Sequence, residues 1–260
     1  MTERNSGALR YITAENIPFP HGFSTRTGGI SGGVFSSLNL GSAQYDNESD
    51  IRENYRRFCA ALGIPQSALA FTRQVHGDVV REVRREYAGE GFTRPAPMDC
   101  DALVTADAGL ALTVFTADCV PVLLCDPVTG VLGTAHAGWR GTALGIVSKT
   151  VDAMAALGAN RAAIRAAVGP ALGPCCFETD DDVPAALFAA LGDEVTPCIE
   201  QKGQKWHIDL REVNALWLRR AGVRQIEADR SCTKCHADLF YSHRRDGFPR
   251  GTLAAMIFRP

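Results

Sequence analysis

Hydrophobic positions recur along the chain at two spacings, one typical of helices and one of strands. The segment SDIRENYRRFCAALGIP, residues 49–65, carries its apolar side chains on one face: Ile51, Tyr55, Phe58, Cys59 and Leu62. This spacing of three and four predicts an amphipathic helix. Ser49 or Asp50 is expected to cap its start, and Gly63 and Pro65 to end it.

The same helical spacing returns in three later segments, residues 143–158, 180–192 and 211–223. In the first of them the expected buried stripe is Leu144, Val147, Val151 and Met154. In the last it is Val213, Leu216, Trp217 and Ala221. Each of these helices is therefore expected to cover a sheet with one face.

Between the helical segments lie short apolar runs that are typical of strands. They are ALAFTRQVHG, ALVT, LALTVFT, VPVLLCD, VLGTAH, AIRAAVGP, WHIDL and TLAAMIFR. The nearly continuous apolarity of several runs predicts strands that are covered on both faces. We therefore expect an α/β fold, with a mixed β-sheet core flanked by helices, in a single domain of residues 1–260. Residues 1–19 are expected to lead into it, and AGEGFTRPAPMD, residues 88–99, to form a mobile loop.

Composition narrows the class of partner. The chain is 46% hydrophobic and 22% charged, with a formal net charge of −2. This charge favours neither nucleic acid nor an anionic membrane surface as a partner. The first residues contain no apolar run of signal-peptide length, which predicts a cytoplasmic protein. We also expect a monomer or a weak homodimer.

The chain contains nine cysteines, and two of its short motifs resemble known functional sites. GISGG resembles a nucleophile elbow around Ser31, but the segment after it is not helical, so a glycine-rich turn is favoured. CTKCH, residues 232–236, matches half of a zinc site or a haem attachment motif, yet no second Cys-x-x-Cys pair completes it. We interpret that match as a coincidence. The roles of Cys100, Cys175 and Cys176 stay open.

Three residues share one expected position in the fold. His76 and His136 end strand-like runs and Cys119 follows one. Residues at strand ends converge on one rim of an α/β sheet, where ligands bind. Two imidazoles and a thiolate suit Zn²⁺ and leave a fourth position for water. The alternatives are ordinary hydrogen-bonded histidines beside a buried cysteine, or a Cys–His nucleophilic pair with Cys119 as the attacking group.

A series of motifs along the chain carries a family resemblance. RQVHG, DALVT, TADCVPVLL, HAGWRGT, GPALGPCCFE, DLREVN and CT…LFYSHRRDG occur in that order, after STRTGGISGG…SLNLG. Together, from about residue 20 to 258, they resemble the laccase-domain (YfiH-like) family, once described as multicopper polyphenol oxidases. Two residues depart from its pattern, Cys100 in MDCDALVT and the histidine of SHRRDG.

The resemblance implies a YfiH/CNF-toxin-like fold and a zinc site formed by His76, Cys119 and His136. It also implies phosphorolysis of adenosine, inosine and S-methyl-5′-thioadenosine, together with deamination of adenosine. Polyphenol oxidation with copper is an older attribution. Peptidoglycan editing, attributed to some bacterial members, would suit a Cys–His amide hydrolase instead.

These reactions require further groups near the metal. Deamination needs a proton carrier, for which Asp118 beside Cys119 is the candidate. Phosphorolysis needs anion ligands, and Arg26, Arg73 and Arg140 are the candidates for that role. With only six histidines, the chain is poorly supplied for a multicopper centre. Cu²⁺ is expected only as an adventitious replacement for Zn²⁺.

Overall fold

Two six-stranded sheets lie face to face and form the centre of the molecule in the computed structural model, which describes residues 1–41, 44–95 and 98–260. The first sheet has the order β1 (Thr2–Ser6), β2 (Leu9–Thr13), β3 (His21–Ser24), β15 (Leu253–Arg259), β7 (Leu110–Thr116), β4 (Leu69–Phe71). The second has the order β14 (Gln225–Ala228), β10 (Arg165–Val168), β8 (Val120–Cys125), β9 (Leu132–Ala137), β6 (Ala102–Thr105), β5 (Val80–Glu82). Both sheets are mixed, since β4 runs parallel to β7 and β10 runs parallel to β14.

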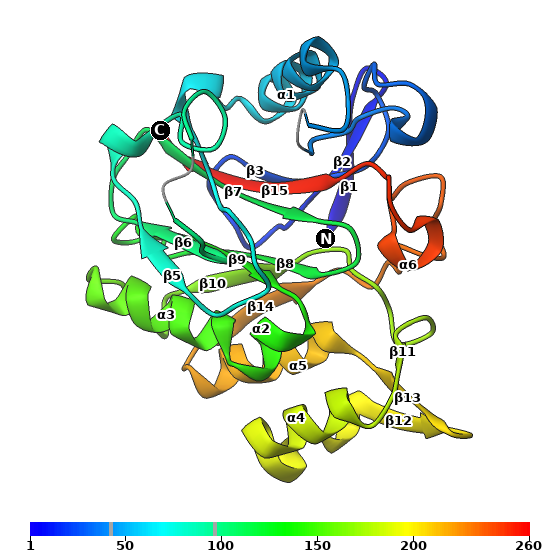
Figure 1. Ribbon diagram of the computed structural model, residues 1–260. Helices are drawn as coiled ribbons and strands as arrows, with labels where there is room; N and C mark the ends of the chain where they lie inside the picture. The colour runs from blue at the N-terminus through cyan, green and yellow to red at the C-terminus, as the bar shows by residue number, and fades with distance from the viewer. Residues whose placement is uncertain (42–43, 96–97) are drawn as a thin grey trace.

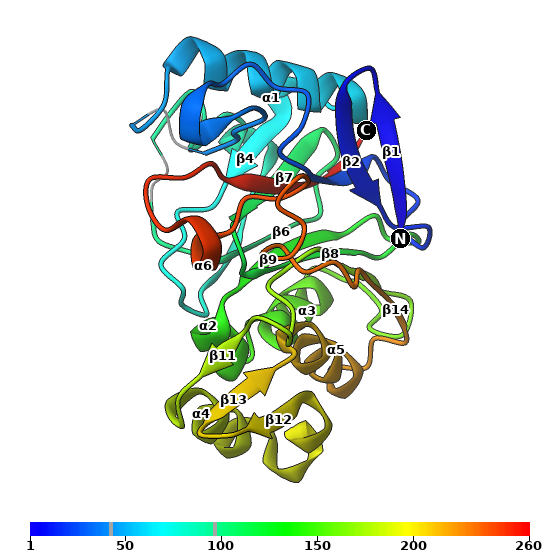
Figure 2. The ribbon, with the colours of Figure 1, turned by 90° about the vertical axis from the view of Figure 1, so that its right-hand side faces the viewer.

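Helices cover the outer faces of this sandwich (Figure 1). The helix α1 (Glu48–Leu62) lies on the first sheet, and α3 (Ile146–Ala156) and α5 (Leu210–Arg220) lie on the second. A small sheet, β11 (Glu178–Thr179), β13 (Lys205–Ile208) and β12 (Ile199–Lys202), extends with α4 (Asp182–Leu191) at the end of the molecule opposite α1 (Figure 2). Two short helices, α2 (Trp139–Ala143) and α6 (His243–Asp246), complete the set.

The continuous apolar strands are explained by the two layers. Side chains alternate between the faces of a strand. In β8, Leu123 belongs to the core between the sheets, whereas Val122 and Leu124 face the core under α3 and α5. In β15, Ile257 faces the other sheet, and Met256 packs in the cluster beneath α1. Because both faces of these strands are buried, their sequences do not alternate between apolar and polar residues.

The predicted α/β class with mixed sheets and flanking helices is confirmed, with two packed sheets where the pattern predicted one. Residues before position 20 do more than lead into the domain, because β1 and β2 extend the first sheet. The loop predicted at residues 88–99 contains no strand or helix in its described part, and residues 96–97 lie outside the described residues.

Three local predictions were wrong. The cap of α1 is Asn47, whose Oδ1 accepts a hydrogen bond from the backbone N–H of Ser49 at 2.9 Å. Leu144 does not face the core: Gly145, with φ of 75°, separates α2 from α3 and leaves Leu144 51% exposed. The strand predicted to reach His76 ends at Phe71.

No helix in the described part of the chain is long and apolar enough to cross a membrane.

Candidate metal and active site

His76, Cys119 and His136 come together at one rim of the sheet sandwich. His136 is the penultimate residue of β9, Cys119 directly precedes β8, and His76 lies in the loop between β4 and β5. Their ligand atoms all lie within 4.8 Å of one another, and the two imidazole rings are 4.9 Å apart at 82°. The structure therefore places the three predicted ligands in one cluster.

Asp101, at the start of β6 and fully buried, organises two of these ligands. Its Oδ1 accepts hydrogen bonds from Nδ1 of His136 at 2.8 Å and from the backbone N–H of His76 at 3.0 Å. Its Oδ2 accepts from the N–H groups of Val75 and Gly77 at 3.1 and 2.9 Å. Asp101 thus holds the turn that carries His76 and directs Nε2 of His136 toward the cluster, as carboxylates behind metal-binding histidines do.

The backbone is strained at this rim. His76 and Asp118 have φ values of 61° and 96°, and they are the only non-glycine residues of the described chain with positive φ. Such conformations cost about 1–3 kcal/mol each and persist where the surrounding contacts enforce them. For His76 the enforcing contact is the carboxylate of Asp101.

Charge within the cluster is strongly coupled. Burial alone would raise the pKa of the Cys119 thiol, but the neighbouring imidazole of His136 outweighs it and lowers that pKa to about 6. Burial would likewise lower the pKa of His136, but the Cys119 thiolate and Asp101 raise it to about 9. Without a metal ion, the pair is therefore a thiolate and an imidazolium at neutral pH.

Gly138 leaves the room that this cluster needs. A Cβ at this position would lie 2.9 Å from Cδ2 of His76 and 3.3 Å from Sγ of Cys119. Its φ of −67° is one that any residue adopts, so the glycine is required by space and not by a turn. Gly141 plays a similar part, since its Cβ would meet the carbonyl oxygen of Gly77 at 2.8 Å.

The donor set fits a single transition-metal ion. Two imidazole nitrogens and one thiolate are ligands that Zn²⁺ and Cu²⁺ both accept. One of the imidazoles is already oriented from behind by a carboxylate. If the three residues held such an ion, a fourth position would remain for water or substrate, as in catalytic zinc sites.

That cavity has a volume of about 430 Å³. The three ligands lie in its wall together with Asp118, Phe115, Phe177, His243, Arg244 and Arg250. Arg250 is partly desolvated, which lowers its pKa, and its charge is offset by Asp118 and Cys119. The lining therefore includes two guanidinium groups besides the three candidate metal ligands.

Asp118 lines the cavity, but its carboxylate is already engaged. Oδ1 accepts a hydrogen bond from the hydroxyl of Thr233 at 2.5 Å, and Oδ2 accepts one from the backbone N–H of Arg244 at 2.6 Å. Asp118 thereby fixes the C-terminal segment that supplies the arginines of the wall.

The arginines predicted as anion ligands lie outside this lining. Arg26 donates to the carbonyl oxygens of Ser36 and Ala237 and stacks on Tyr241. Arg140 is exposed and lies over the ring of Trp139 at 4.3 Å. Arg73 donates to Asp99 at 2.5 Å and lines a neighbouring cavity. The structure does not bring any of the three beside His76, Cys119 and His136.

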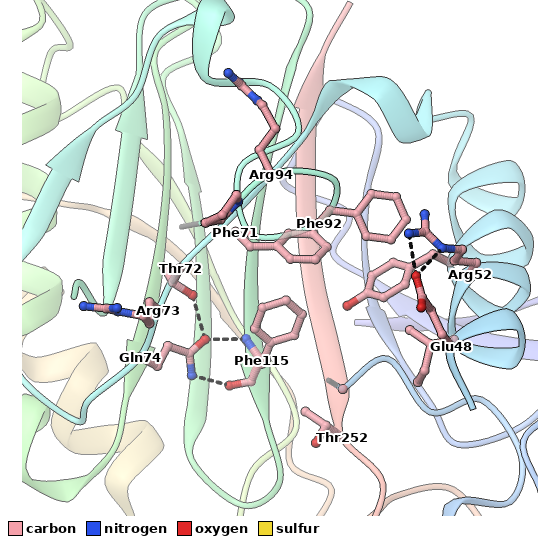
Figure 3. Close-up of a pocket in the computed structure, with 15 residues that line it drawn as sticks. Glu48, Arg52, Phe71, Thr72, Arg73, Gln74, Phe92, Arg94, Phe115 and Thr252 are labelled. Carbon is pink, nitrogen blue, oxygen red and sulfur yellow. Dashed lines mark hydrogen bonds and ion pairs between the residues drawn. The ribbon is translucent and has the colours of Figure 1, made fainter. Parts of the chain in front are cut away.

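The neighbouring cavity, of about 550 Å³, shares Gln74, Phe115 and Thr252 with the first. Figure 3 shows the rings of Phe71, Phe92 and Phe115 gathered at its centre, with the side chain of Arg73 directed away from them. Gln74 forms the partition: its amide accepts from the N–H of Phe115 and donates to the carbonyl oxygen of the same residue, at 2.7 and 2.8 Å. The cavity that holds the candidate metal ligands thus adjoins a second cavity in which three phenylalanine rings gather.

A family model described as multi-copper polyphenol oxidoreductase laccase matches residues 20–260. The chain belongs to this family. A purine nucleoside phosphorylase of Deinococcus radiodurans is 41% identical over 97% of this chain and 94% of its own length. The crystal structure of YlmD from Geobacillus stearothermophilus superposes with a TM-score of 0.92 and 35% identity, covering 98% of this chain and 97% of that one. The crystal structure of the Bacillus licheniformis hypothetical protein YfiH superposes with a TM-score of 0.91 at 35% identity, covering 99% of both chains.

The resemblance to the laccase-domain family is thus confirmed, but reasoning from the sequence missed several residues of its site. Asp101 stands in the quoted motif DALVT, and its position before a buried strand was the available signal. Arg244 and Arg250 follow LFYS in SHRRDGFPR, a basic stretch whose proximity to Cys119 depends on a contact across more than 120 residues. Neither pattern nor spacing reveals such a contact.

Proposed function

We propose that this laccase-domain protein is a purine nucleoside phosphorylase that works in the cavity beside His76, Cys119 and His136. The observation that carries the proposal is the composition of that cavity, whose lining combines three candidate metal ligands with Arg244 and Arg250. Guanidinium groups match the oxygens of a phosphate co-substrate. Relatives that cover nearly the whole chain are named purine nucleoside phosphorylases.

The adjoining aromatic cavity is where we place the purine or the sugar that carries it. The ring centroid of Phe71 lies 5.5 Å from that of Phe92 and 4.9 Å from that of Phe115. Such a group of rings is suited to stacking on a heterocycle. Gln74 lies between the two cavities, and substrate could displace its hydrogen bonds to Phe115. The glycosidic bond would then lie at the boundary between this cavity and the one lined by His76, Cys119 and His136.

We propose Zn²⁺ as the resident metal, held by His76, Cys119 and His136. When bound, zinc supplies Lewis acidity and activates water, which is the chemistry that deamination of adenosine requires. Asp101 keeps His136 in the tautomer that offers Nε2. Asp118 is the proposed proton carrier, since a carboxylate that accepts two hydrogen bonds retains lone pairs for a proton.

The test is product chromatography with purified protein of measured zinc content. Adenosine, inosine and S-methyl-5′-thioadenosine are each incubated with and without phosphate. We expect free base only when phosphate is present, and inosine from adenosine in either case. His136→Ala should lose the zinc held by His76, Cys119 and His136 together with both activities, whereas the control Cys198→Ser, a half-buried cysteine outside the cavity, should keep them. Absence of all products from zinc-replete protein would refute the purine proposal.

A second candidate function is favoured by one observation, the cluster of Cys119 with His136, whose imidazole is held from behind by Asp101. The same imidazole lowers the pKa of the Cys119 thiol. Cys119, His136 and Asp101 have the order of a nucleophile, a base and an orienting carboxylate. In amide hydrolysis the thiolate would attack the carbonyl carbon and His136 would protonate the leaving amine, as peptidoglycan editing would require. This alternative predicts activity in protein stripped of metal and its abolition when Cys119 is alkylated. Loss of activity on chelation, with recovery on adding zinc, would exclude it.

Copper-dependent polyphenol oxidation is the weakest candidate. A multicopper centre requires many histidines, and the chain has six. Within the described residues, the potential metal-binding clusters contain only two of them, His76 and His136. Copper bound in place of zinc would therefore form a mononuclear site.

A further inference from the structure

A second cluster of potential metal ligands lies away from the cavity. Cys175 and Cys176 belong to the loop between β10 and β11, and Cys232 and Cys235 belong to the loop between β14 and α6. The four Sγ atoms all lie within 4.8 Å of one another. The CTKCH motif, interpreted from the sequence as a coincidence, thus finds its missing half in an adjacent pair of cysteines and not in a second Cys-x-x-Cys.

The fold brings the two loops together. Strands β10 and β14 are parallel neighbours, so both loops leave the same edge of the second sheet. A bridge joins Ala171 to Cys232, and the N–H of Thr233 donates to the carbonyl oxygen of Ala171 at 3.1 Å. Cysteines separated by more than 55 residues in the sequence therefore face each other because of sheet topology.

We propose that Cys175, Cys176, Cys232 and Cys235 form a structural zinc site of four thiolates. Zinc–sulfur bonds of about 2.3 Å place the sulfurs of a tetrahedral site roughly 3.8 Å apart. Sγ of Cys235 lies 3.7 Å from that of Cys175 and 3.4 Å from that of Cys176. The Cys-x-x-Cys spacing of the second pair is the one that structural zinc sites use.

The surroundings suit a cluster with excess negative charge. The N–H of Gly173 donates to Sγ of Cys232 at 3.3 Å, an interaction typical of thiolate ligands. A Cβ at Gly173 would lie 3.3 Å from both Nη2 of Arg211 and Sγ of Cys175, so the guanidinium lies next to the cluster. Arg211 is only 3% exposed, and its Nη1 donates to the carbonyl oxygens of Asp229 and Ser231. Nε of Arg211 also pairs with Asp209 at 3.3 Å, so a buried and partly neutralised guanidinium is fixed beside four thiolates, whose net charge with one Zn²⁺ would be −2.

This site also supports the wall of the cavity. Nη1 of Arg244 donates to the carbonyl oxygens of Cys176 and Glu178 at 3.4 and 3.0 Å. The hydroxyl of Thr233, next to Cys232, donates to Asp118. Metal in the four-cysteine site would therefore hold two loops that position Arg244 and Asp118, while all four coordination positions stay closed to substrate.

The experiment counts metal per chain in protein purified under reducing conditions. We expect two zinc ions in the native chain and in the control Cys198→Ser, and one each in His136→Ala and Cys235→Ser. X-ray absorption at the zinc edge of His136→Ala should show sulfur ligands alone, at about 2.3 Å. Unchanged zinc content in Cys235→Ser, or none in His136→Ala, would overturn the proposal, whichever reaction the cavity performs.

A measurement on the native chain covers the case in which Cys235→Ser does not fold. Cys175 and Cys235 are exposed, so iodoacetamide can reach both sulfurs when no metal is bound. We expect both to be protected until a chelator removes the metal, and mass spectrometry to show four reduced thiols after removal. Immediate alkylation of either residue, or a disulfide among the four in freshly isolated protein, would refute the zinc site.

Discussion

Replacing Asp101 by asparagine tests whether one buried carboxylate builds the metal site. Each Asp101 oxygen accepts two hydrogen bonds, so the new amide NH₂ must face two donors in either orientation. Hydrogen bonds to a charged group contribute about 1.5–3 kcal/mol each, so loss of two lowers the free energy of unfolding by about 3–6 kcal/mol. Domains are stable by only about 5–15 kcal/mol. Asp101→Asn should therefore fold marginally and bind zinc about 10–100-fold more weakly, as second-sphere changes do.

The matched control is Asp126→Asn. Asp126 is equally buried and accepts backbone hydrogen bonds from Val128, Thr129 and Asn160, with no contact to the metal ligands. Its amide NH₂ can replace the oxygen that faces a single donor, Asn160, so we expect a loss of about 1.5–3 kcal/mol in unfolding free energy and unchanged zinc affinity. Urea unfolding gives the stabilities, and competition with a chromophoric chelator gives the affinities. Wild-type zinc affinity in folded Asp101→Asn would refute the reasoning.

The pH dependence of the free energy of unfolding provides a second test of the role of Asp101. Although burial acts to raise the pKa of Asp101, the hydrogen bonds from His136 and the backbone lower it below its ordinary value. A carboxyl with a depressed folded-state pKa stabilises the protein above its unfolded pKa, and this contribution is lost as the pH falls. In metal-free protein, Asp101→Asn should therefore have a lower free energy of unfolding near neutral pH than the wild type. That free energy should also change less as the pH falls. An unchanged slope between wild type and variant would contradict the role assigned to this carboxylate.

Further predictions follow from the same geometry. Gly138→Ala should weaken zinc binding with little effect on Tm. The control Gly32→Ala, whose Cβ meets nothing within 4 Å, should change neither quantity. Equal zinc affinities of the two variants would contradict the packing argument. In metal-free protein, alkylation of Cys119 should rise with pH around a midpoint of about 6, and a midpoint near the ordinary thiol value of about 8.5 would contradict the thiolate–imidazolium pair. Arg250→Ala should raise the KM for phosphate more than tenfold, a loss of at least about 1.4 kcal/mol, while the exposed Arg224→Ala should not; a phosphate KM that stays unchanged in Arg250→Ala would remove this residue from the anion site. Any phenol oxidation should require added copper and vanish in zinc-only protein, and robust turnover without copper would overturn that expectation.

The sequence determined the local elements and pointed to three candidate metal ligands. Spacing alone predicted α1 and its buried face, because an amphipathic helix repeats its contacts every three or four residues. The central strands were visible as apolar runs. His76, Cys119 and His136 were predicted to lie together because each stands beside a strand-like run, and the family motifs contain all three.

Tertiary structure decided what lies next to those elements. Two sheets were indistinguishable from one in the sequence, since a strand buried on both faces has no period that tells which layer it faces. Asp101 binds the turn of His76 across 25 residues, and Arg244 meets Asp118 across 126. The four cysteines at 175, 176, 232 and 235 meet only because β10 and β14 are parallel neighbours. Local patterns report which face of an element is buried, but they carry no information on which distant loop is packed against it.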